Sequence, residues 1–398
     1  MQKAHMAEGL SHWIGRRRDA RLRPVAGEQE IGVAALSQPS PERPGESAPR
    51  QQSRHPRIDA HCHIVIPEVL EMTRAVKLRG SGPGKRDWIP EESRRAHREQ
   101  ADQTEEKLLH PEARLPDMDA MGIDIQVVSM NLPTPAYWAA AAVGQRIARA
   151  CNEGVAAFVR RRPDRFLGIG VVPLQDVRLA LRELDHIAGL DLRGVQIPSN
   201  VRNREVGEAA FRPFWARAAE LGLPVIIHPR GFTHDDRLHK FFLWNTIGQP
   251  LEEALAMASL IHEGVLDAYP DLRVVMSHGG GYLPYYSGRG DRAFHSRPEP
   301  KRNIAKPPSA YFPRFYYDSV VFDPDMMPRL IRQAGADRIV MGTDYPRGEV
   351  EEDPVGFIGG LAGVSAADKL RMMSTNAQAL FGLPAQAGGP GGLPDQER

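Results

Sequence analysis

The stretch RIDAHCHIV at residues 57–65 decides the fold, because it reads as the first of a series of short buried strands. Each strand is followed by a segment with helical periodicity, such as residues 139–161 and 209–221. Strands separated by about 10–20 residues of helix indicate parallel βαβ units. The eight predicted strands are Arg57–Val65, Ile123–Asn131, Phe166–Pro173, Gly194–Pro198, Pro224–Pro229, Arg273–His278, Phe315–Val321 and Arg338–Tyr345.

Eight such units predict an α/β protein with a (β/α)8 TIM barrel rather than an open doubly wound sheet. The sequence has neither a Gly-x-Gly-x-x-Gly motif after the first strand nor a Gly-x-x-x-x-Gly-Lys motif, which disfavours nucleotide binding. Two insertions follow strands one and five, at residues 66–116 and 230–250. We expect them to contribute to substrate recognition, because loops at the carboxyl ends of barrel strands usually do. The alternative for the first insertion is a solvated excursion.

The barrel is expected to span residues 55–384, with a tail at each end. Residues 1–54 have weak apolar periodicity and are rich in Ser, Pro, Gln, Glu and Arg. Such a segment buries too little surface to offset its ordering entropy, so it is predicted to be a disordered N-terminal extension. Residues 385–398 contain the run GGPGG and are predicted to be a flexible C-terminal tail.

Composition excludes several classes of protein. The 398 residues include 51 Lys and Arg against 50 Asp and Glu, and a net charge of +1 gives no electrostatic case for nucleic acid or a membrane surface. No apolar run approaches the ~18–20 residues of a membrane span. The two cysteines, Cys62 and Cys151, cannot form a disulfide framework. A reducing compartment, and hence a cytoplasmic location, is expected.

Histidines end several of the predicted strands. His61 and His63 lie two residues apart on the first strand, so both can face the barrel mouth while Cys62 faces the other way. His228 ends the fifth strand and His278 ends the sixth. Two imidazoles on one face can share a metal ion, although each histidine alone could equally be a buried structural residue.

A carboxylate, Asp344, ends the eighth strand at the same predicted edge of the barrel. Three histidines and one carboxylate are suitable ligands for Zn2+ or a similar transition ion, with a position left for water. The fourth strand, Arg193–Pro198, contains no lysine that could be carbamylated to bridge two ions, which favours a single metal.

The strand ends resemble one branch of the amidohydrolase superfamily, the branch that contains aminocarboxymuconate-semialdehyde decarboxylase. The resemblance extends over roughly residues 57–383. Its motifs are His61-Cys62-His63, His228-Pro229, Ser277-His278-Gly279-Gly280-Gly281 and Gly342-Thr343-Asp344-Tyr345-Pro346.

The resemblance implies a role for each of these residues. The ligands of one divalent metal, Zn2+ by preference or Mn2+, would be His61, His63, His228 and Asp344. Asp344 would also belong to the catalytic group together with His278, which would be the acid/base residue rather than a ligand.

Arg289 corresponds in this resemblance to an arginine that binds the substrate carboxylate from a neighbouring subunit. It therefore implies a homodimer with a shared active site, and the alternative for Arg289 is a surface salt bridge. A second substrate-binding arginine is expected in the first insertion, where Arg86, Arg94, Arg95 and Arg98 are the candidates.

The resulting prediction is a metal-dependent nonoxidative decarboxylase of a small unsaturated or aromatic carboxylate, in which the metal activates water and His278 transfers protons. An arginine that binds a carboxylate with two parallel hydrogen bonds favours this reaction. One alternative is a hydrolase or hydratase acting on a related carboxylate ring-cleavage product. Another is a catalytically silent binding or scaffold protein, which the presence of every ligand and of His278 disfavours.

Overall fold

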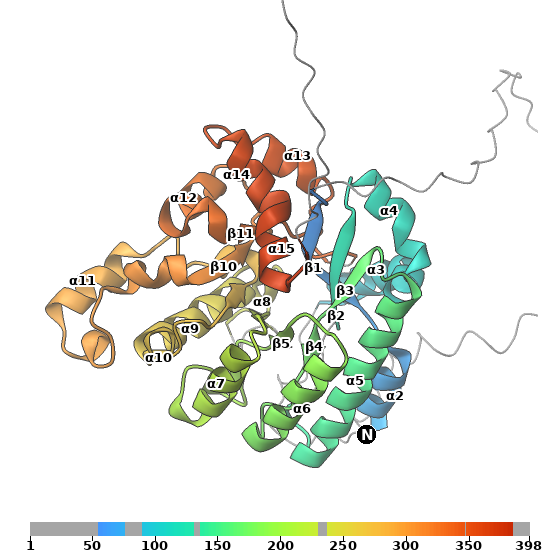
Figure 1. The fold of residues 1–398 in the computed structure, drawn as a ribbon, viewed down its shortest axis with the longest axis horizontal. Coiled ribbons are helices and arrows are strands. Elements are labelled where there is room, and N and C mark those ends of the chain that lie inside the picture. The colour runs from blue at the N-terminus through green and yellow to red at the C-terminus, as the bar shows by residue number, and fades with distance from the viewer. Residues whose placement is uncertain (1–54, 76–89, 131–135, 230–236, 347, 385–398) are drawn as a thin grey trace, which may run out of the picture. The chain divides into compact units, whose positions relative to one another are not determined.

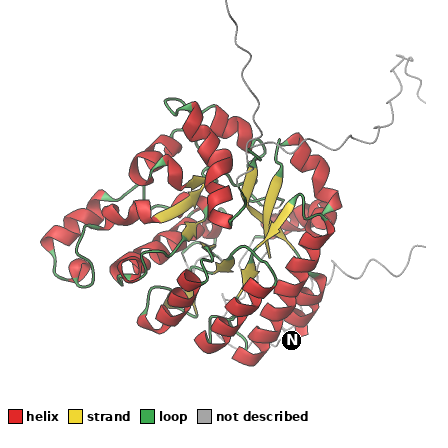
Figure 2. Cartoon of the chain, viewed as in Figure 1, coloured by secondary structure: helices red, strands yellow, loops and turns green. Residues whose placement is uncertain are grey.

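The structure is a computed structural model that describes residues 55–75, 90–130, 136–229, 237–346 and 348–384 (Figure 1). The predicted tails, residues 1–54 and 385–398, lie outside the described residues, as does Arg86. Figure 2 shows the strands gathered at the centre of the fold with helices around them. The arrangement is the one expected of a (β/α)8 barrel.

Each of the eight predicted strands is present, and every one is shorter than predicted because its ends turn into loops. The third is interrupted at Ile169 and forms two short segments. The barrel strands are β1 (Ile58–Ile64), β2 (Ile125–Met130), β3 (Phe166–Gly168), β4 (Gly170–Val171), β5 (Val195–Ile197), β8 (Val225–Ile227), β9 (Val274–Met276), β10 (Phe315–Asp318) and β11 (Ile339–Val340).

The barrel strands pair in parallel in the order β1-β2-β3 and β4-β5-β8-β9-β10-β11. The last strand returns to the first, since the amide of Ala60 donates to the carbonyl of Met341 at 2.8 Å and that of His63 to the carbonyl of Tyr345 at 2.7 Å. Besides the barrel strands, β6 (Asn200–Val201) and β7 (Arg204–Glu205) form a small antiparallel hairpin.

The helices surround the barrel strands and fill the insertions (Figures 1 and 2). A π-helical turn at Arg371–Thr375 joins the last two. The helices are α2 (Pro67–Ala75), α3 (Glu91–Leu109), α4 (Leu115–Ala120), α5 (Ala141–Arg161), α6 (Val177–Gly189), α7 (Arg212–Glu220), α8 (Leu243–Thr246), α9 (Gly248–His262), α10 (Val265–Ala268), α11 (Gly288–Ser296), α12 (Met326–Ala334), α13 (Pro354–Gly359), α14 (Ala366–Leu370) and α15 (Asn376–Phe381). No described helix is both long and apolar enough to cross a bilayer.

An apolar cluster fills the interior at the amino-terminal end of the strands. One or two side chains from most strands meet there, and α15 closes the opening from below with Leu380 and Phe381. The members from the strands are Ile58, Ala60, Val127, Ile169, Ile226, Val275 and Val340. This end of the barrel is a packed core, so the polar chemistry is left to the carboxyl ends.

A β-bulge in β1 separates the core from the polar end. Asp59 pairs with Gln126 and Cys62 with Val128, so three steps along β1 match two along β2. The extra residue breaks the alternation of side chains. As a result, Ala60 belongs to the interior core while His61 and His63 still share the next interior layer. Strict alternation from Ile58 would instead have turned Cys62 inward.

Candidate metal centre

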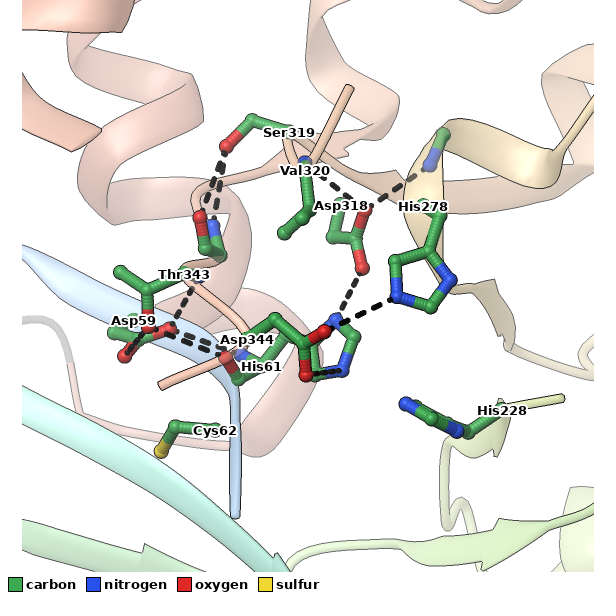
Figure 3. A network of polar contacts seen from close by, with 12 residues as sticks. Asp59, His61, Cys62, His228, His278, Asp318, Ser319, Val320, Thr343 and Asp344 are labelled. Carbon is green, nitrogen blue, oxygen red and sulfur yellow. Dashed lines mark hydrogen bonds and ion pairs between the residues drawn. The ribbon is translucent and has the colours of Figure 1, made fainter. Parts of the chain in front are cut away.

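Four histidines and one aspartate converge at the carboxyl ends of β1, β8, β9 and β11, and Figure 3 shows His61, His228, His278 and Asp344 of this group. The ring centroid of His61 lies 5.1 Å from that of His63, 5.0 Å from that of His228 and 5.2 Å from that of His278. Figure 3 shows Asp344 between His61 and His278. The structure therefore brings together all five side chains that the sequence placed at the barrel mouth.

The two histidines of β1 are held by hydrogen bonds on the side away from the cluster. His61 Nδ1 lies 2.6 Å from Asp318 Oδ2, and His63 Nδ1 lies 3.0 Å from the hydroxyl of Ser129. These contacts leave both Nε2 atoms facing inward, 3.2 Å apart. Metal-binding histidines are oriented in this way, because a bond to one ring nitrogen fixes the tautomer and aims the other.

His228 supplies independent evidence for a cation. Its Nδ1 is satisfied by the carbonyl of Pro229 at 2.8 Å, whereas its Nε2 is buried and has no hydrogen-bond partner among the residues that the structure describes. A buried nitrogen without a partner costs free energy unless a ligand occupies its lone pair. Burial, aided by the neighbouring His63 and His61, holds the pKa of His228 well below its ordinary value, so the ring is neutral and able to bind a metal.

Asp344 is the carboxylate that faces the histidines. Its Oδ1 lies 2.9 Å from His63 Nε2 and 3.4 Å from His61 Nε2, and its Oδ2 lies 3.5 Å from His278 Nε2. Burial alone would raise the pKa of Asp344, but the surrounding histidines outweigh it and hold that pKa well below the usual range. The residue has φ 60°, a left-handed conformation that Asp tolerates and that often marks functional sites.

The donor atoms that lie within 4.8 Å of one another come from His61, His228, His278 and Asp344. His63 completes the cluster through its 2.9 Å contact with Asp344. Nitrogen and carboxylate oxygen suit Zn2+ or Mn2+. The residues thus fit a single divalent ion, and the division of roles between His63 and His278 stays a prediction.

His278, like His61, has a carboxylate at its Nδ1. Its Nδ1 lies 2.6 Å from Oε1 of Glu253, a fully buried residue of α9. Burial lowers the pKa of His278, but the carboxylates of Glu253 and Asp344 outweigh it and raise the pKa well above its ordinary value. The imidazole is therefore equipped to hold a proton beside the centre, as an acid/base group requires.

The chain turns sharply after His278. This residue has φ 47°, and the three glycines that follow all have positive φ. At Gly281 a Cβ atom would lie 2.0 Å from the carbonyl oxygen of Pro250, so only glycine fits this approach to the start of α9. The glycine run therefore brings the loop that carries His278 against the helix that carries Glu253.

A buried network of hydrogen bonds connects the strands and the loop that carry the site residues. Asp59 accepts hydrogen bonds from the hydroxyl of Thr343 at 2.7 Å and from the amide of Gln126 at 3.0 Å. Gln126 in turn accepts a bond from Arg114, whose guanidinium also donates to the carbonyl of His63 at 2.8 Å. Burial raises the pKa of Asp59 to about 6. The network ties β1, β2 and the loop of Asp344 together.

Of the predicted arginines, the four that the structure describes do not lie in this cluster. Arg289 is exposed at the start of α11, which extends outward from the barrel in Figure 1. Arg94 and Arg98 pair with Glu91, and Arg95 pairs with Glu99, all on the exposed surface of α3. The predicted role of Arg289 requires a second subunit.

Three residues that contact the site histidines were not identified from the sequence, and one of them is Ser129 of β2, the partner of His63. Asp318 ends β10, so a search for polar residues at strand ends could have found it as the partner of His61. Glu253 lies in a helix next to another glutamate, Glu252, and no local pattern distinguishes the two. Cys62, which was expected to face away from the barrel mouth, is fully buried, and burial raises its pKa well above the ordinary value.

Comparison with known proteins assigns the family. The sequence profile of the family described as Amidohydrolase matches residues 58–383. The 2-amino-3-carboxymuconate-6-semialdehyde decarboxylase of Dictyostelium discoideum is 32% identical over 69% of this chain and 77% of its own length. The gamma-resorcylate decarboxylase of Rhizobium radiobacter is 31% identical over 68% of this chain and 87% of its own length.

Solved structures agree with this assignment. A dihydroxybenzoic acid decarboxylase from a Polaromonas species, with bound manganese and 2-nitroresorcinol, matches with a TM-score of 0.70 and 26% identity over 83% of this chain and 97% of its own. A manganese-bound 5-carboxyvanillate decarboxylase from Novosphingobium aromaticivorans matches with a TM-score of 0.72 and 26% identity over the same shares of the two chains. This chain therefore belongs to the amidohydrolase superfamily, in the branch of aminocarboxymuconate-semialdehyde decarboxylase, as its strand-end motifs predicted.

Proposed function

We propose that the protein is a metal-dependent nonoxidative decarboxylase of a small aromatic or unsaturated carboxylate. The observation that carries the proposal is the placement of His278, which contacts the metal-centre carboxylate Asp344 on one side and the buried Glu253 on the other. A proton donor next to a cation site is what protonation of a substrate carbon requires. The relatives named as decarboxylases of aromatic and muconate carboxylates support the same reaction.

One divalent cation would be held by His61, His63, His228 and Asp344, with Zn2+ our first choice and Mn2+ the alternative. When bound, the cation supplies positive charge that polarises substrate oxygens and lowers the pKa of water. The unpartnered Nε2 of His228 supports a cation at this position. The manganese in two related decarboxylases supports a divalent ion and leaves Mn2+ as a candidate.

In the proposed reaction, Nε2 of His278 delivers its proton to the substrate carbon that bears the carboxylate. The new C–H bond interrupts conjugation, the bond from that carbon to the carboxylate then breaks, and its electron pair restores the conjugated system as CO2 leaves. His278 afterwards regains a proton from solvent. Glu253 and Asp344 stabilise the protonated imidazole before the transfer.

We further propose that the enzyme is a homodimer in which Arg289 of one subunit binds the substrate carboxylate in the site of the other. Arg289 is exposed in the first turn of α11, so its guanidinium is accessible to a second subunit. A guanidinium can bind a carboxylate with two parallel hydrogen bonds.

The test is to load the metal-free protein with Zn2+ or Mn2+ and incubate it with a panel of hydroxybenzoates and muconate semialdehydes in D2O. The proposal predicts release of CO2 and one deuterium in the product at the carbon that lost the carboxylate. Ring opening or hydration of these compounds without CO2 would instead indicate the hydrolase alternative and contradict the proposal.

A further inference from the structure

The carboxylate of Glu253 is placed in an unusual way. The residue is fully buried in α9, and its Oε1 accepts a hydrogen bond from His278 Nδ1 at 2.6 Å. Its Oε2 is also buried and has no hydrogen-bond partner among the described residues. Burying a carboxylate with half of its acceptors unsatisfied is costly, and a structural role in the helix does not require it.

The neighbouring Glu252 shows what a structural carboxylate on the same helix looks like. It is nearly as buried, and one of its oxygens, Oε2, accepts hydrogen bonds from Ser199 at 2.6 Å and from Asn200 at 2.8 Å. Those bonds fasten α9 to the loop after β5. By contrast, the one described hydrogen bond of Glu253 goes to His278.

A buried carboxylate also contacts the Nδ1 of a histidine on the metal-binding side of the centre, where Asp318 lies 2.6 Å from His61 Nδ1. There the carboxylate aims a predicted metal ligand. A histidine whose Nδ1–H is held in this way presents its Nε2 to the opposite side. For His278 that opposite side is the cluster, because its Nε2 lies 3.5 Å from Asp344 Oδ2.

We propose that Glu253 is a positioning residue for the proton transfer. Its bond to Nδ1 fixes the tautomer and the ring orientation of His278, so that Nε2 points to the place where the substrate carbon is protonated. This inference rests on the proposed decarboxylation for its kinetic consequence. The orientation of the ring itself can be tested without turnover.

Two variants separate orientation from charge. In Glu253→Gln the amide oxygen can still accept the Nδ1–H bond but the negative charge is lost, and in Glu253→Leu both are lost at similar volume. Glu252→Gln is the matched control, since it removes a buried carboxylate from the same helix without touching His278. Each protein is measured with Zn2+ loaded, for metal content, unfolding temperature, kcat and KM.

We expect Glu253→Leu to lower kcat by about 10–100-fold, as loss of an orienting partner of a site histidine usually does. KM should stay within about twofold and one metal per chain should remain bound. The decrease in kcat should be smaller for Glu253→Gln than for Glu253→Leu. Glu252→Gln should retain kcat within a few-fold while losing stability comparable to that lost by Glu253→Gln.

A readout independent of activity is the proton NMR signal of His278 Nδ1–H, which a strong bond to a carboxylate moves far downfield. The signal, assigned by its absence in His278→Ala, should be present in the starting protein and in Glu252→Gln and absent in Glu253→Leu. A kcat in Glu253→Leu equal to that of the starting protein, or a signal that persists in this variant, would overturn the inference. If no carboxylate releases CO2 while the signal behaves as expected, the proposed function fails and the positioning of His278 stands.

Discussion

At the amino-terminal end of the barrel, Ile58, Val127 and Val275 belong to an apolar cluster that Phe381 of α15 completes. A few residues further along the same strands or just past their ends lie His61, Ser129 and His278. One end is held together by apolar contacts that lower the free energy of folding. The other end concentrates buried charges that are favourable only when paired with each other or with a cation. The same strands therefore support stability at their amino-terminal ends and chemistry at their carboxyl ends.

The largest effect is expected at the polar end. Replacing His278 with Ala should reduce turnover by about 10²–10⁴-fold, because the proton donor is lost. Metal content, measured by atomic absorption, should be unchanged, since His278 is assigned as the acid/base group. Loss of the metal together with activity would show that His278 is a ligand, and the assignment would then be wrong.

A substitution in the apolar cluster tests the other end of the barrel. Phe381→Ala should destabilise the fold by about 3–5 kcal/mol, because it leaves a cavity in the core under the strands. The free energy of unfolding from urea titration measures this loss, and metal affinity and KM of the remaining folded protein should not change. If Phe381→Ala lowered the free energy of metal binding as much as the free energy of unfolding, the apolar cluster and the metal centre would not be independent.

A smaller effect is expected at the predicted subunit boundary. Arg289→Ala should raise KM by about 10–100-fold, because it removes charged hydrogen bonds to the substrate carboxylate. Mixing this variant with Asp344→Ala should restore part of the activity, since a mixed dimer would contain one complete site. Verified mixed dimers that recover no activity would argue against a shared site.

The smallest effect concerns pH. Burial lowers the pKa of His61, but Asp344 and Asp318 outweigh it and raise the pKa, so the metal-free protein holds a proton that the cation must displace. Metal affinity should therefore fall by about tenfold for each pH unit below that raised pKa and level off above it. The pKa values of His63 and His228 are lowered by burial, so protons compete less with the cation at these rings than at His61. Calorimetric titration in two buffers measures the released proton, and a release near zero at low pH would contradict the assignment.

Much of this arrangement is predictable from the sequence because it depends on local patterns. The strands are short apolar runs, and parallel strands joined by helices bring their carboxyl ends to one edge, which is enough to group His61, His228 and Asp344. The bulge in β1 was not predictable, since it depends on how β1 pairs with β2. The prediction that His61 and His63 share a face was nevertheless right, because both rings reach the same cluster although the register shifts between Asp59 and Cys62.

The partners of the histidines could not be derived, for a different reason. Glu253 and His278 are 25 residues apart, and their contact depends on how closely the loop of Gly281 approaches α9. Helical periodicity places Glu252 and Glu253 equally near the buried face. Only packing shows that Glu252 turns to Ser199 whereas Glu253 turns to the centre.

The dependence of the reaction on one divalent ion can be measured directly. Divalent ions are stripped from the purified protein, CO2 release is followed, and one equivalent of Zn2+ or Mn2+ per chain is then added back. We expect CO2 release to cease on stripping and to return with one ion bound per chain. We also expect His228→Ala to regain little of it, because this variant lacks the Nε2 atom that has no hydrogen-bond partner among the described residues. Full activity in protein proven free of metal would show that the reaction does not depend on a cation.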